Sequence, residues 1–271
     1  MSKILFVTSM NDSLYEEYAH LFLKEFNQYA GKDIHMINFV DKGSTEIFKV
    51  KYDKIDSKLL NCELHERFLR FYGNVASAKG IRIKLDKDTG KYKVQFSYQF
   101  NAITYSYKVF AMNKAFQFAK NNNYDYLIWS DADMRCKKDF TLEDLEEFLP
   151  NKEDLMSYLG RSHFPTPPHS ETGFLAFNIM HMEFNNFINS VINTYMTGRV
   201  FTFDQFHDCW VFDRIREEYE QLGYKFKNLS GDYAYTEHPF INTNLGLFFD
   251  HLKGPSRKST LKSHDNDYVN K

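Results

Sequence analysis

The first forty residues constrain the fold more than any other part of the chain. Residues 4–9 form an apolar run that predicts a strand ending in a polar turn. Residues 14–29 repeat apolar side chains at helical spacing, and residues 33–40 are predicted to form a second strand. A strand, a helix and a strand in this order form a βαβ unit, whose strands are parallel. We therefore predict an α/β fold with a central, mostly parallel, twisted sheet flanked by helices, and with ligands at the carboxyl ends of the strands.

The rest of the chain continues to alternate between predicted helices and predicted strands. A β-hairpin is predicted at residues 79–96, around a polar turn. Further helices are predicted at 58–72, 101–120, 141–148, 182–197 and 206–222, and further strands at 124–130, 155–159 and 170–178. Residues 163–169 hold three of the six prolines and predict an irregular loop, and residues 241–249 are the last predicted ordered segment. No Gly-x-Gly pattern follows the first strand, so a dinucleotide fingerprint is absent.

Composition excludes several classes of protein. Aromatic residues make up 17% of the 271 residues, with only 12 Gly and 6 Pro, as in an ordered globular protein. The net charge of −2 gives no overall attraction to nucleic acid or membrane, although a local basic patch is compatible with it. Cys62, Cys136 and Cys209 form no close pair, which favours a reducing compartment. No signal-peptide layout is seen and no apolar stretch approaches the roughly 20 residues of a membrane-spanning helix, so we expect a cytoplasmic protein.

Two carboxylates follow the predicted strand at residues 124–130. Asp131 and Asp133 are two positions apart, and on an extended chain this spacing points both side chains to the same side. Like charges side by side repel, and carboxylate oxygens are the ligands that Mg²⁺ and Mn²⁺ prefer. The pair therefore indicates a divalent cation, and the plainer alternative is a loop with two solvated acids.

Four motifs together resemble one family of enzymes. The apolar strand ending in Asp131-Ala132-Asp133 resembles the acidic signature of glycosyltransferases with the type-A fold. The strand at 171–178, the acidic helix start at 204–208 and the segment 251–257 resemble further parts of retaining glucosyl- and galactosyltransferases related to glycogenin. Arg257 stands where that family has Lys, and a flanking aromatic residue is missing. Compact size and composition are similar to glycosyltransferase-like proteins of bacteria and their viruses, which implies the cytoplasm of a bacterium or of an infected host cell.

This resemblance implies a set of site residues. Asp131, Asp133 and His251 are expected to bind Mn²⁺ or Mg²⁺, with Mn²⁺ the usual ion of the family. The donor is expected to be a nucleotide sugar, UDP-glucose or UDP-galactose, contacted by Thr8, Ser9, Asn11, Lys108, Asp131, Lys253, Gly254, Arg257 and Lys258. Asp133, Glu171 and Asp208 are the expected catalytic residues, and Asp204, Gln205 and Asp208 are expected to bind the acceptor.

Plainer interpretations of the same residues stay open. Glu171 at the start of a strand could be held by Ser170 or His169, and His251 could be packed under a loop. Asp204 and Asp208 would stabilise a helix N-terminus without any functional role. Lys108 could be a solvated helix lysine.

The resemblance implies a single glycosyltransferase domain at residues 1–262. Its nucleotide-binding half is expected at 1–135 and its acceptor-side half at 136–262, with a polar tail at 263–271 that frays. The expected reaction moves a hexose from the nucleotide-diphosphate sugar to a hydroxyl acceptor with retention of anomeric configuration. One alternative is the same chemistry on hydroxymethylated bases of phage DNA, and another is a metal-dependent nucleotidyl- or phosphotransferase.

The acceptor is left open between a glycan, a small molecule and modified DNA. DNA as the acceptor requires a cationic groove and an extruded base. The lysines at 79–93 and 253–262 are the candidates for such a groove, but the overall charge balance is acidic.

Overall fold

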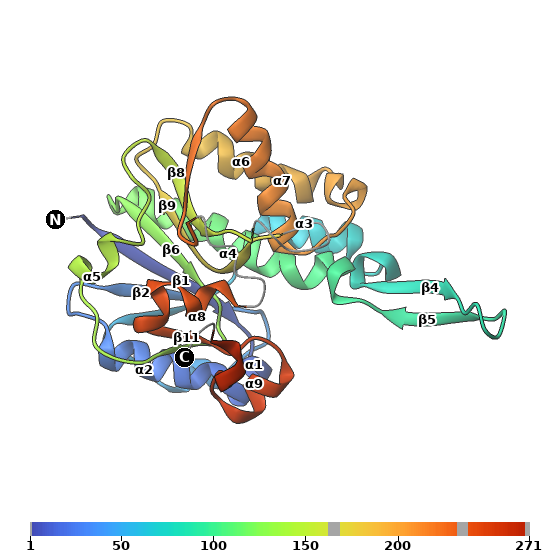
Figure 1. Ribbon diagram of the computed structural model, residues 1–271, viewed down its shortest axis with the longest axis horizontal. Helices are drawn as coiled ribbons and strands as arrows, with labels where there is room; N and C mark the ends of the chain where they lie inside the picture. The colour runs from blue at the N-terminus through green and yellow to red at the C-terminus, as the bar shows by residue number, and fades with distance from the viewer. Residues whose placement is uncertain (1, 162–168, 232–237, 269–271) are drawn as a thin grey trace.

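The computed structural model describes residues 2–161, 169–231 and 238–268 (Figure 1). Its centre is a seven-stranded sheet in the order β10-β8-β9-β6-β1-β2-β3. The strands are β1 (Ile4–Met10), β2 (His35–Val40), β3 (Ile55–Leu59), β6 (Tyr126–Ser130), β8 (Asp154–Leu159), β9 (Glu171–Asn178) and β10 (Lys225–Asn228). Of these, only β9 runs antiparallel to its two neighbours, β6 and β8. The expected α/β fold with a mostly parallel central sheet is therefore confirmed.

Helices cover both faces of this sheet. The α3 (Glu63–Tyr72), α4 (Ala102–Asn121), α6 (Phe184–Met196) and α7 (Asp208–Gln221) helices pack on one face. On the other face lie α2 (His20–Tyr29), α5 (Leu142–Glu146) and α8 (Pro239–Asn242). Alternate residues of β1 belong to opposite clusters, Leu5 and Val7 to the first and Ile4 and Phe6 to the second. This period of two is the one that a strand buried on both faces requires.

Three smaller features complete the chain. A short α1 (Asp12–Leu14) and a π-helical turn, Tyr15–Ala19, precede α2. The short strands β7 (Met134–Cys136) and β11 (Phe249–His251) pair antiparallel, and α9 (Pro255–Thr260) follows β11. The hairpin of β4 (Ile81–Leu85) and β5 (Tyr92–Phe96) projects away from the body of the molecule (Figure 1). No helix of the described residues is long and apolar enough to cross a bilayer.

Two sequence predictions are wrong in their details. The helix expected at 58–72 begins at Glu63, because residues 55–59 instead pair with β2 as the edge strand β3. The tail expected to fray from residue 263 is packed as far as the description reaches, with Ser263 bonded to Asp250 and Asp267 paired with Arg257. Residues 163–168 of the predicted loop lie outside the described residues.

Candidate metal centre and active site

The edge of the sheet where the parallel strands end gathers the acidic side chains. Asp131 follows β6 directly, and its backbone N–H donates to the carbonyl of Gly173 on β9 at 2.9 Å. Because β9 runs the other way, its first residue, Glu171, lies at this same edge. Strand direction therefore places the beginning of one strand beside the ends of its neighbours.

A second pairing adds a histidine to the acidic pair. In the β7–β11 ladder His251 lies opposite Met134, and the N–H of Leu252 donates to the carbonyl of Asp133 at 2.9 Å. His251 Nε2 then lies 3.2 Å from Asp133 Oδ1. One ligand atom from each of Asp131, Asp133 and His251 lies within 4.8 Å of the others. Two carboxylates and an imidazole this close fit a divalent cation.

Two lysines neutralise these carboxylates. Lys108 of α4 is buried, with its ammonium 2.9 Å from Asp131, 2.7 Å from Asp208 and 2.6 Å from the carbonyl of Thr172. Lys258 of α9 lies 2.9 Å from the other oxygen of Asp133, Oδ2. Every acid of the cluster thus has a cationic neighbour.

The pKa values follow from this arrangement. Burial raises the pKa of Asp131, although Lys108 opposes the change. Burial would also raise the pKa of Asp133, but His251 and Lys258 outweigh it and hold that pKa well below its usual range. The pKa of His251 is raised because Asp133 and Glu171 outweigh the cost of burial. Strongly shifted groups at one edge of the sheet are typical of functional sites.

A pocket of about 470 Å³ opens beside this cluster. Asp131, Asp133, Lys108, Lys258 and Asp208 line one part of it. The remaining wall is made by Ser9, Met10, Asn11, Leu14, Tyr18, Asp41, Thr104, Tyr105, Tyr107, Trp129 and Ala132. Its volume lies in the range of small-molecule and cofactor sites.

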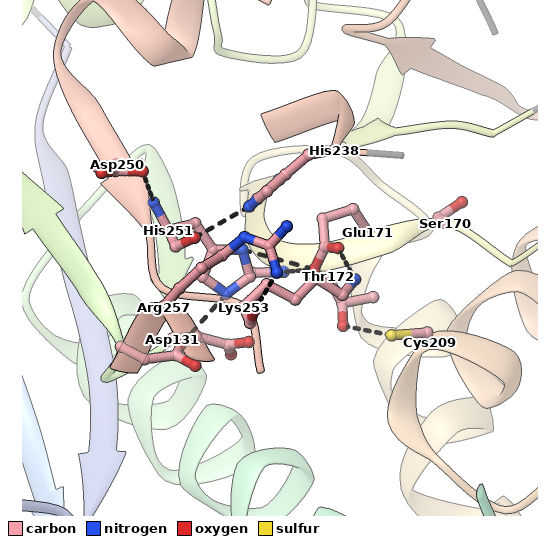
Figure 2. Close-up of polar contacts among 12 residues, drawn as sticks. Asp131, Ser170, Glu171, Thr172, Cys209, His238, Asp250, His251, Lys253 and Arg257 are labelled. Atoms are coloured by element: carbon pink, nitrogen blue, oxygen red, sulfur yellow. Dashed lines mark hydrogen bonds and ion pairs between the residues drawn. The ribbon is translucent and has the colours of Figure 1, made fainter. Parts of the chain in front are cut away.

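Glu171 lies behind the cluster and is held by two cations. Its carboxylate is paired with Arg161 at 2.7 Å and with Lys253, and its side chain is buried (Figure 2). These partners hold its pKa well below the usual range despite burial. Glu171 does not line the pocket of 470 Å³.

Asp208 opens α7 and faces the pocket. It accepts hydrogen bonds from Lys108 and, at 2.6 Å, from the hydroxyl of Thr172. Burial opposes these contacts, but they lower its pKa. Cys209, its neighbour, has a pKa raised by burial and contacts Thr172 (Figure 2).

Other residues expected at the site lie farther from the cluster. Arg257 is paired with Asp267 and donates to the carbonyl of Lys253, and Gly254 precedes α9 with a left-handed φ of 83°. Asp204 is exposed, and the amide oxygen of Gln205 lies 2.7 Å from the imidazole of His207. Ser9 and Asn11 line the pocket, whereas Thr8 is fully buried and is not part of its lining.

Sequence reasoning missed several side chains of the pocket, among them Tyr18, Asp41 and Trp129. Tyr18 touches Lys258 through its hydroxyl at 3.2 Å, and burial raises the pKa of Asp41 to about 7. Trp129 donates its indole N–H to Asp131 at 2.6 Å. Trp129 carried a usable signal, since it stands on β6 two residues before Asp131. Tyr18 and Asp41 carried none, because Tyr18 belongs to the apolar repeat of a helical segment and Asp41 is a single acid after a strand.

No protein-family model and no curated protein matches this sequence. Among solved structures, the chain is similar to the apo form of mouse xyloside xylosyltransferase 1, at 12% sequence identity and a TM-score of 0.48, with 84% of each chain covered. A likeness at this level does not assign a function.

Proposed function

We propose that this protein is a metal-dependent glycosyltransferase. It moves a hexose from a nucleotide-diphosphate sugar, UDP-glucose or UDP-galactose, to a hydroxyl of an acceptor, with retention of the anomeric configuration. The observation that carries the proposal is the meeting of Asp131, Asp133 and His251, from two distant parts of the chain, beside the 470 Å³ pocket that the two aspartates line.

The chemistry of the donor explains why such a cluster is useful. When a glycosidic bond to a diphosphate breaks, negative charge grows on the leaving group. Asp131, Asp133 and His251 would hold a divalent cation, and when bound it would supply Lewis-acid stabilisation of that charge. Around it, the side chains of the protein must bind the nucleotide, orient the sugar and hold the acceptor.

Lys258 is suited to binding the diphosphate. It lines the pocket and belongs to the short helix α9, none of whose side chains is fully buried. Its ammonium rests between Asp133 and the hydroxyl of Tyr18, and a phosphate oxygen arriving beside Asp133 would take up the same cation. When the donor binds, Lys258 therefore leaves the carboxylate of Asp133 and pairs with a phosphate of the donor.

The carboxylates beside the cluster favour retention. An inverting enzyme needs a base with a pKa near the working pH to take the acceptor proton. Asp208 and Glu171 are both paired with cations, and both have lowered pKa values, so neither of these two is a good proton acceptor near neutrality. Asp41, whose pKa burial raises to about 7, also lines the pocket, but it follows β2 among the residues suited to the nucleobase. Asp208 faces the pocket as an ion and is suited to accepting hydrogen bonds from sugar or acceptor hydroxyls.

The opposite end of the pocket is suited to the nucleobase. Ser9 and Asn11 follow β1, and Asp41 follows β2, so all three lie at the carboxyl ends of parallel strands. Their side chains offer hydrogen-bond donors and acceptors beside the apolar surface of Leu14.

Titration calorimetry with UDP tests the proposal. We expect tight binding with Mn²⁺ and weak binding in EDTA. Asp133→Ala should reduce turnover of the nucleotide sugar by on the order of 100-fold or more, because the leaving group loses electrostatic stabilisation. Asp139→Ala, at an exposed carboxylate, is the matched control and should retain activity. Equal UDP affinity with and without Mn²⁺ would contradict the proposal.

Stereochemistry needs its own measurement. NMR of the anomeric proton of the product should show an α-linked sugar from an α-linked donor. A β-linked product would move Asp208 to the role of base.

A further inference from the structure

The β4–β5 hairpin presents an apolar face that none of the described residues covers. The strand register pairs Ile81 with Phe96, Ile83 with Val94, and Leu85 with Tyr92. Residues directly opposite one another, and alternate residues of a strand, share a face of the ribbon. All six side chains are exposed, from 38% for Ile81 to 70% for Ile83, 74% for Val94 and 76% for Tyr92. Six neighbouring apolar side chains in water mark a surface that meets a partner.

The same hairpin carries the opposite charge to the rest of the chain. Residues 79–93 contain six basic side chains, Lys79, Arg82, Lys84, Lys87, Lys91 and Lys93, against two acidic ones, Asp86 and Asp88, a net charge of +4. The whole chain has a net charge of −2. Lys84 lies opposite Lys93 on the face that carries no apolar side chains, and Lys87 and Lys91 lie at the tip. The hairpin is therefore amphipathic and locally cationic.

The root of the hairpin is fixed to the core. The guanidinium of Arg82 lies 4.0 Å from the ring of Phe100, and that ring packs edge-on against Phe206 at 5.2 Å. The N–H of Ser97 donates to the carbonyl of Gly80 at 2.8 Å, closing the base of the hairpin. Beyond these contacts the hairpin projects away from the body of the molecule (Figure 1). Within the part of the chain that the structure describes, its outer part is exposed on both faces.

The charge of the hairpin argues against a second copy of itself as its partner. Two hairpins that each carry a net charge of +4 would repel one another when their faces met. A nucleic acid would use the lysines but would leave the aliphatic side chains exposed. An anionic lipid surface uses both features, because apolar side chains enter the headgroup boundary while lysines stay near the phosphates.

We propose that the β4–β5 hairpin is an arm that binds the surface of an anionic lipid bilayer. Ile83, Leu85, Tyr92 and Val94, toward the tip, enter the boundary between headgroups and acyl chains. Tyr92 places an aromatic ring with a polar end at the depth that such rings favour. The lysines of the tip and of the opposite face contact lipid phosphates. This inference does not depend on the chemistry of the pocket.

Vesicle flotation with the full chain tests the arm. The vesicles are made of phosphatidylcholine alone or of phosphatidylcholine mixed with phosphatidylglycerol. The wild type should float with the mixed vesicles and much less with the neutral ones, and added salt should weaken its binding. Changing Ile83 and Val94 together to Ser should reduce partitioning by about tenfold or more, because two inserted side chains become polar.

Matched variants separate binding through the hairpin from nonspecific adsorption to vesicles. Met180 and Met182 are 71% and 84% exposed and lie outside the hairpin, so changing both to Ser should leave flotation unchanged. Lys87→Gln with Lys91→Gln should weaken binding to the mixed vesicles only. All variants should melt at the wild-type temperature, since none of these side chains is buried.

Three outcomes would overturn the proposal. One is no flotation of the wild type with the mixed vesicles. A second is a dimer in sedimentation that the Ile83 and Val94 change dissociates, which would make the hairpin a protein contact. The third is tighter binding to duplex DNA than to vesicles, lost on changing Lys84 and Lys93 to Gln.

Discussion

Lys108 is a buried cation shared by Asp131 and Asp208. Replacing it with Met leaves two carboxylates close together without their common counter-ion. We expect Lys108→Met to lower the free energy of unfolding in EDTA by about 2–4 kcal/mol, the range for breaking a buried pair reduced for the partial exposure of Asp131. Mn²⁺ should restore more stability to this variant than to the wild type, because binding to the folded state alone stabilises it. Urea unfolding with and without Mn²⁺ measures both effects.

The control for this change is Lys120→Met, at an exposed position on the same helix. It should unfold like the wild type in both conditions. Equal losses for the two variants would show that Lys108 does not neutralise the site.

The raised pKa of Asp41 predicts that the free energy of unfolding depends on pH. Burial raises its pKa to about 7 in the folded protein, against a hydrogen bond from Asn11 that lowers it, whereas an unfolded Asp titrates near about 4. The folded state therefore keeps a proton that the unfolded state loses between about pH 4 and pH 7. The free energy of unfolding should therefore fall as the pH rises through this window. Above about pH 7 the full penalty of a charged, partly buried Asp41 applies.

Asp41→Asn should remove that penalty. We expect the variant to be more stable than the wild type by about 1–3 kcal/mol at about pH 8, and equally stable at about pH 4. Urea denaturation across this range measures the difference, with the exposed Asp53→Asn as control. A constant difference between variant and wild type at every pH would contradict the assignment.

At the scale of elements, β9 fixes the position of His251. A Cβ added at Gly173 would lie 2.7 Å from Cε1 of the His251 ring, closer than real contacts allow. Gly173→Ala should therefore displace the imidazole and weaken Mn²⁺ binding by roughly 10–100-fold, the scale for disturbing the surroundings of a metal ligand. Titration calorimetry with Mn²⁺ measures this loss.

Gly31→Ala is the matched substitution. Its added Cβ would meet its nearest atom, the carbonyl oxygen of Phe140, at 3.4 Å, an ordinary contact. Its Mn²⁺ affinity should equal that of the wild type. Unchanged affinity in Gly173→Ala would show that His251 is not a ligand.

At the scale of the whole molecule, the C-terminal segment supports the site from outside. Ser263 donates to Asp250, and Asp250 in turn accepts from the N–H of His251 at 2.8 Å (Figure 2). Asp267 holds Arg257. Ending the chain after Lys262 should lower the melting temperature by ~5 °C and weaken UDP binding in the presence of Mn²⁺.

Ending the chain after Tyr268 provides the comparison, because all of these contacts are kept. That chain should melt and bind UDP like the full protein. Calorimetric melting and UDP titration on both chains separate the two outcomes.

Much of the architecture was predictable because its pattern is local. The strands around Phe6 and Ile128 are apolar runs, and α4 repeats its apolar side chains over 20 residues. The short strands β7, β10 and β11 were missed, since three or four residues carry no periodicity and form strands only through their partners. The edge strand β3 was assigned in part to a helix for the same reason.

The candidate site was likewise predictable where its residues form a pattern along the chain, and not where it depends on contacts between separate elements. Asp131 and Asp133 were predicted to lie together because two carboxylates after a strand form a pattern, and His251 was added through a resemblance; the structure brings the three side chains close to one another. That Lys108 bridges Asp131 and Asp208 could not be read from the sequence, because the three residues come from three separate elements.

The distance along the chain between Asp133 and His251, 118 residues, has a consequence for biosynthesis. At ordinary rates of translation the ribosome needs on the order of 10 s to add that many residues. Throughout that interval the two aspartates exist without their histidine. The proposed three-ligand site is therefore complete only near the end of synthesis, when β11 can pair with β7.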